Sequence, residues 1–141
     1  GKEAIFAEIR RRQDHRYARL VQAEPVPATF RETLRLNIKT YIRLALSNIE
    51  LHAALVRDVP KFATSEAESI LIVDSLEQSN RTINSRAIKL RPQCDTAIAL
   101  ELTTRVLRST IDDYAMHAPE QLKQSVVTDQ LLDMLERYLL P

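Results

Sequence analysis

Glycine is almost absent from this sequence, since Gly1 is the only one in 141 residues. That absence excludes a glycine-rich phosphate loop and the hairpin turns that depend on glycine. Cys94 is the only cysteine, so an internal disulfide is impossible, which fits a reducing compartment such as the cytoplasm. No apolar run is long enough to cross a bilayer, so we expect no membrane partner. The net charge of +1 is too balanced for a nucleic-acid-binding surface.

Helix-forming residues fill the sequence instead. Leu, Ala, Arg, Glu and Ile dominate, and few windows alternate with period two, so we expect one all-α domain over residues 1–141. Prolines and capping residues divide the chain into about six helices. Their expected ranges are Lys2–Gln22, a stretch from Ala28 to Val59 that breaks at Asn48, a helix from Ser65 to about Leu90, Asp95–His117 and Gln121–Leu140. Ser65 and Glu68 form a capping box in this pattern.

The helix predicted from Asp95 to His117 is apolar on two sides. A narrow polar strip holds two charge pairs spaced four apart, Glu101 with Arg105 and Arg108 with Asp112, which can support the helix locally. One apolar side consists of Leu100, Leu107, Ile111 and Tyr114. The other consists of Ala99, Leu102, Val106 and Ser109. A helix of this kind must be covered on both sides.

The last helix has a similarly broad apolar arc. Its main stripe consists of Val127, Leu131, Met134 and Tyr138, and Leu132, Leu135 and Leu139 widen it. Either both helices are central in a monomer, or they also pack against a second copy as a four-helix bundle. We expect a homodimer. Its predicted interface residues are Leu102, Val106, Leu132, Leu135 and Leu139.

Both ends of the chain resemble the tetracycline-repressor (TetR) family of bacterial transcription regulators. The opening "GKEAIFAEI", with Lys2, Glu3, Ala4 and Ile5, is similar to the segment that follows the family's helix-turn-helix. The stretches "LRPQCDTAIALELTTRVLRST" and "LLDMLERYLLP" are similar to its last two helices. The order and spacing of the helices between them fit as well, so the resemblance covers essentially the whole chain.

The resemblance implies a fold and a function. It implies a helical bundle like the family's C-terminal regulatory domain, which binds a small effector between its helices and dimerises through its last two major helices. The DNA-reading module would lie before Gly1, with residues 1–22 as the connecting helix. Operator DNA would then be bound only through that absent module. Effector binding would shift the connecting helix, and repression is the usual outcome in the family.

An effector pocket in a helical domain should be largely apolar, with a few polar groups directed inward. Polar or amphipathic side chains occur on the apolar faces of four predicted helices. These candidates are Gln13, Tyr17, Asn37, Tyr41, His52 and Asn80. Each has an alternative role, because a buried amide, imidazole or phenol commonly pairs with a neighbouring polar group. We expect a small, largely apolar effector.

Catalytic and metal-binding patterns are not found. His15, His52 and His117 lie far apart without other ligands at metal-binding spacing, and no serine lies in a nucleophile motif. We therefore expect no cofactor, no metal and no enzymatic activity. The alternative function is a stand-alone helical protein-interaction module not involved in transcription.

Overall fold

The computed structural model describes residues 1–62, 89–93 and 95–141, and over this range the chain is all-α, without strands. The prediction of an all-α chain is therefore confirmed for these residues. The helices are α1 (Lys2–Ala23), α2 (Phe30–Ser47), α3 (Ile49–Phe62), α5 (Thr96–His117), α6 (Pro119–Leu122) and α7 (Ser125–Leu139). The helix predicted to begin at Ser65, with its capping box and with Asn80, lies outside the described residues.

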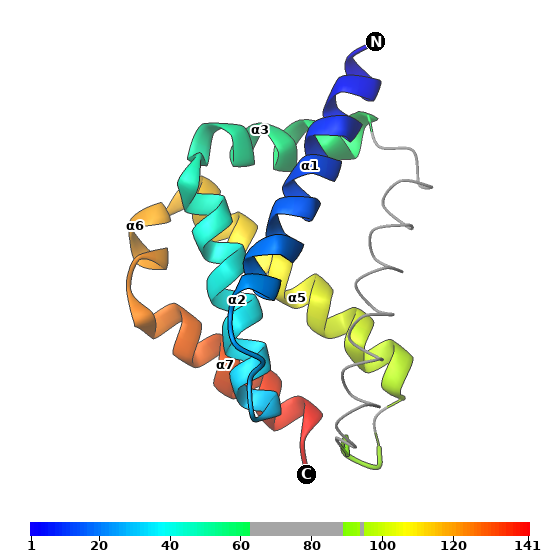
Figure 1. Cartoon of the computed structure of the whole chain (residues 1–141), viewed down its shortest axis with the longest axis vertical. Coiled ribbons are helices and arrows are strands. Elements are labelled where there is room, and N and C mark those ends of the chain that lie inside the picture. The colour runs from blue at the N-terminus through cyan, green and yellow to red at the C-terminus, as the bar shows by residue number, and fades with distance from the viewer. Residues whose placement is uncertain (63–88, 94) are drawn as a thin grey trace.

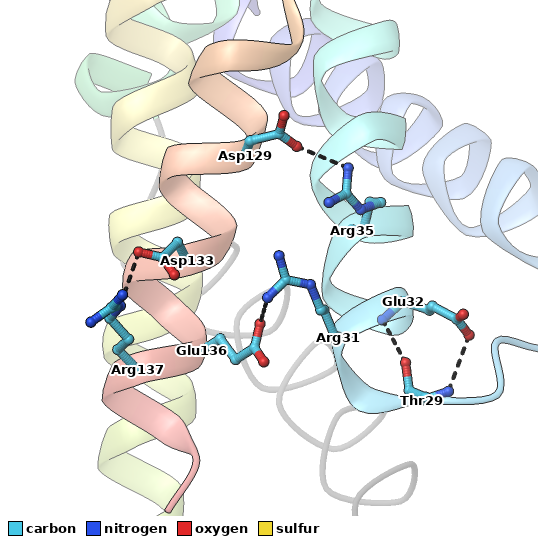
Figure 2. Close-up of polar contacts among 8 residues, drawn as sticks. All are labelled: Thr29, Arg31, Glu32, Arg35, Asp129, Asp133, Glu136 and Arg137. Atoms are coloured by element: carbon cyan, nitrogen blue, oxygen red, sulfur yellow. Dashed lines mark hydrogen bonds and ion pairs between the residues drawn. The ribbon is translucent and has the colours of Figure 1, made fainter.

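Side-chain caps explain where three of these helices begin. At α2 the Thr29 hydroxyl accepts from the Glu32 amide at 3.1 Å, and the Glu32 carboxylate accepts from the Thr29 amide at 3.2 Å (Figure 2). Asn48 ends α2 and its side chain accepts from the Leu51 amide at 3.0 Å, so the predicted break is confirmed. The Asp95 carboxylate caps α5 in the same way.

The C-terminal helix is shorter than expected. The sequence pattern predicted one helix over Gln121–Leu140, but the chain first forms the short α6 and then α7 from Ser125 to Leu139. Pro119 occupies the first turn of α6, where its fixed φ is already helical. Gln124 then adopts an extended backbone with φ −94° and ψ 145°, which separates the two helices.

The α2 helix is central, and α1, α3, α5 and α7 all pack against it (Figure 1). The deepest side chains of the core come from several of these helices. Ile38, Ile111, Leu132 and Leu139 are completely buried. Burying such a side chain stabilises the fold by roughly 1.5–3 kcal/mol, so this cluster fixes how the helices sit around α2.

Two ion pairs join α2 to α7 along one edge of the core (Figure 2). Arg31 pairs with Glu136, and Arg35 lies 2.9 Å from Asp129. The two basic residues are four apart, so they lie on successive turns of α2. The two acids are seven apart, so they lie two turns apart on α7. The pairs therefore show which turns of the two helices lie opposite each other, in the arrangement that the core sets.

Candidate functional site

A cavity of about 390 Å³ lies among α1 and the linker after it, α2, α5 and the end of α7. This volume falls within the range of small-molecule sites, roughly 300–1,000 Å³. Its lining is mainly apolar. The apolar wall includes Val21, Phe30, Leu34, Leu100, Leu107 and Leu139.

Of the predicted effector-binding residues, Tyr17, Asn37 and Tyr41 line this cavity. The Tyr17 hydroxyl donates to Asn37 Oδ1 at 2.5 Å, and Asn37 Nδ2 donates to the Thr33 carbonyl at 2.9 Å. Burial raises the pKa of Tyr17 to about 12, so the phenol keeps its proton and remains a donor at neutral pH. The bond joins α1 to α2, and both side chains therefore have structural partners beside the cavity.

His52 and Tyr41 meet at the carboxylate of Asp112. The Tyr41 hydroxyl donates to Asp112 Oδ1 at 2.8 Å, and His52 Nε2 lies 2.7 Å from the same oxygen. Burial raises the pKa of Tyr41, and the neighbouring Asp112 charge raises it further. His52 is only 8% exposed and does not line the large cavity. It ties α3 to α5 through Asp112, which is one of the structural roles open to it from the sequence.

Gln13 lines a second, smaller space together with Tyr41 and His52. The volume of this space is about 20 Å³, little more than a water molecule needs and too small for an effector. The Gln13 Oε1 atom is buried and has no hydrogen-bond partner among the described residues. Asn80, the remaining candidate, lies outside those residues.

Arg10, Asp14 and Arg108 line the smaller space, and Arg108 lines the large cavity as well. Asp14 on α1 lies 3.9 Å from Arg10 Nε and 4.0 Å from Arg108 Nη2, distances too long for hydrogen bonds. Burial raises the pKa of Asp14, although Arg10 and Arg108 oppose that shift. The Arg108 guanidinium carbon lies 5.8 Å from the centre of the Tyr41 ring, a cation–π distance. A loosely paired cation therefore lies between α1 and α5.

The sequence pattern missed the roles of Arg108 and Asp112. It placed both on a polar strip as a pair within α5, and it correctly paired Glu101 with Arg105, whose atoms lie 3.0 Å apart. One turn later the strip faces other helices, so Arg108 turns toward Asp14 and Asp112 turns toward α2 and α3. The strip borders the buried side of α5, and helical periodicity alone does not show that α1 and α3 pass over it.

The predicted interface residues divide into two groups. On α7, Leu132, Leu135 and Leu139 have exposed fractions of 0%, 3% and 0%, because they pack into the core of their own chain. On α5, Leu102 and Val106 remain 46% and 37% exposed. The first apolar side of α5 therefore packs within the chain. On the second side Ala99 is buried as well, and Leu102 and Val106 are open to a partner.

The rest of the described chain shows neither a membrane-spanning helix nor a metal-binding cluster. None of its helices is both long enough and apolar enough to cross a bilayer. In the same residues, no three His, Cys, Asp or Glu side chains come together as metal ligands.

Comparisons with protein-family models, with curated proteins and with solved structures found no match to the chain. The TetR resemblance therefore rests on the sequence motifs and on the order of the helices.

Proposed function

We propose that this chain is the ligand-sensing and homodimerising domain of a TetR-like transcriptional regulator, a repressor in the usual case. The observation that carries the proposal is the cavity of about 390 Å³ with α1 as one of its walls. In this proposal α1 connects to a DNA-reading module, and the cavity binds a small effector. A ligand in the cavity would contact Tyr17 and Val21 of α1 directly.

An effector can shift the position of α1 only if it binds one arrangement better than the other. Beside the cavity, a partly buried side-chain hydrogen bond from Tyr17 to Asn37 holds α1 to α2. A ligand that competes for these two polar groups would have such a differential affinity. Two-fold DNA readers require half-sites about 34–36 Å apart, so a small displacement of the connecting helices is enough to weaken operator binding.

The dimer in this proposal uses the open side of α5. Ile98, Leu102 and Val106 are spaced four residues apart on this helix, with exposed fractions of 53%, 46% and 37%. Such spacing places three apolar side chains along one stripe. A second copy could bury the same stripe across a two-fold axis, which is the usual symmetry of a homodimer.

A chimeric repressor tests the proposal. A DNA-binding head that binds its operator only as a dimer is fused ahead of Gly1, and repression of a reporter gene is measured. We expect the wild-type chain to restore repression and Leu102→Asp to abolish it. Val126→Asp is the matched control, because Val126 is 61% exposed but lies on another helix, in the first turn of α7 after the α6–α7 junction. An inactive wild-type chimera, or equal repression by all three, would contradict the proposal.

The second candidate is a helical protein-interaction module not involved in transcription. The same stripe of Ile98, Leu102 and Val106 favours it, since an exposed apolar row on a helix also suits a different partner protein. The source gene separates the two candidates. A helix-turn-helix encoded directly before Gly1 supports the regulator, and an unrelated sequence there supports the interaction module.

A further inference from the structure

The large cavity has one cationic side chain in its described lining. Arg108 of α5 borders the cavity beside Tyr17 and Tyr41, and Glu24 at the end of α1 is the only acidic residue in that lining. Glu24 is exposed, whereas the Arg108 side chain is only 21% exposed. A mainly apolar space with a single recessed positive charge selects for an apolar molecule with one negative group.

The Arg108 guanidinium is available for such a group. Among the described residues its ion-pair partner is Asp14, whose Oδ1 is 4.0 Å away, and Asp14 also lies 3.9 Å from Arg10. The nearby Asp112 carboxylate already accepts from Tyr41 and contacts His52. No hydrogen bond joins Arg108 to another described residue, although a guanidinium carries five N–H donors. A bound carboxylate would satisfy two of them in the bidentate geometry that Arg favours.

We propose that the cavity binds a small apolar monocarboxylic acid, with its carboxylate on Arg108 and its apolar part against Val21, Phe30, Leu34 and Leu107. This inference rests on the proposed function, because it names the class of effector for the same cavity. One cation matches one negative charge, so a doubly charged phosphate head would be left partly uncompensated in this apolar site. An amine would be repelled by Arg108.

The same contact gives the ligand a route to α1. Asp14 lies on α1, and Arg108 lies on α5. A carboxylate that binds Arg108 replaces Asp14 as its partner and so removes one attraction between the two helices. The acid therefore favours the arrangement in which α1 is released from α5, which is the differential affinity that a regulatory effector requires.

Octanoic acid and 1-octanol form a matched pair of probes, because they share a chain length and differ in charge. Binding of each to the 141-residue chain is measured by titration calorimetry at pH 7. We expect octanoate to bind at least about tenfold more tightly than octanol, which corresponds to one charge-assisted contact. Arg108→Met should remove this preference, and Arg108→Lys should retain part of it. Arg105→Met is the control, since Arg105 is exposed on the same helix and pairs with Glu101.

Equal binding of the two probes to the wild-type chain would overturn the inference and leave an apolar effector cavity in place. So would an octanoate preference that Arg108→Met leaves unchanged. Binding of neither probe would also overturn it. The chimeric reporter measures dimerisation without any ligand. Failure of the proposed regulator function would therefore be distinguished from failure of the proposed ligand class. Circular dichroism tests whether each variant is folded. If Arg108→Met is unstable, Arg108→Lys still tests the contact, because it keeps the charge.

Discussion

Asp14 has a carboxylate oxygen, Oδ2, that is buried without a hydrogen-bond partner among the described residues. Burial raises the pKa of this residue in the folded chain, despite the two arginines nearby. The folded chain therefore binds a proton at Asp14 more tightly than the unfolded chain does. The resulting stabilisation is complete below the unfolded pKa of about 3.8 and is lost as the pH rises through the folded pKa.

Asp14→Asn imitates the protonated form at every pH. We expect this variant to unfold at a higher temperature than the wild type at pH 7, and the difference to disappear near pH 3. Thermal unfolding followed by circular dichroism measures both values. Asp113→Asn is the control, because the Asp113 side chain is 75% exposed. A difference that stays constant or grows on acidification would contradict the expected role of Asp14.

Single residues also show what the sequence could predict of the site. Helical periodicity correctly placed Tyr17, Asn37 and Tyr41 on inward faces, and the structure brings them to one cavity. It did not identify Arg108, because a charged residue beside an exposed ion pair has the pattern of a solvated face. Which helix passes over that face depends on tertiary packing, and one helix considered alone carries no such information.

At the scale of helices, the start of α2 depends on a reciprocal pair of hydrogen bonds between Thr29 and Glu32 (Figure 2). Thr29→Ala removes the hydroxyl that accepts from the Glu32 amide. We expect a loss of about 1 kcal/mol in the free energy of unfolding, measured by urea denaturation. Thr29→Ser keeps the hydroxyl and should retain most of the stability. Equal losses for Ala and Ser would contradict the capping role.

The ion pair between Arg35 and Asp129 joins α2 to α7 and is partly exposed, with exposed fractions of 34% and 47%. A double-mutant cycle with Arg35→Ala and Asp129→Ala should give a coupling energy of roughly 0.2–1 kcal/mol, as for other exposed pairs. The coupling should fall at 1 M salt, because screening weakens exposed charges. A coupling that is independent of salt would show that the two side chains interact by packing instead.

The helix boundaries were largely predictable because caps and prolines are local signals. Asn48 and Asp95 mark boundaries through side-chain hydrogen bonds within three residues, and both were correctly placed. The short α6 was not predicted. Its turn at Pro119 and the extended Gln124 interrupt a pattern whose apolar spacing continues into α7.

For the molecule as a whole, the two groups of predicted interface residues should behave differently. Leu132 is completely buried in its own chain, so Leu132→Ala should cost roughly 2–5 kcal/mol of unfolding free energy. Leu102 is 46% exposed, so Leu102→Asp should leave the chain folded and convert the proposed dimer to a monomer in sedimentation experiments. A wild-type chain that sediments as a monomer at tens of micromolar would contradict the dimer. Unchanged stability in Leu132→Ala would contradict the core assignment.

In the proposed switch, a displacement of α1 near the Tyr17–Asn37 hydrogen bond would tilt the whole helix. In the view of Figure 1 its first turn extends past α3, and Ile5 near that end is 61% exposed. From Tyr17 back to Gly1 the helix is about 24 Å long, at about 1.5 Å per residue. A tilt of about 10° about Tyr17 would therefore displace Gly1 by about 4 Å, close to the rise of three helical residues. A small tilt near the cavity would thus produce a larger displacement at the N-terminal end of α1.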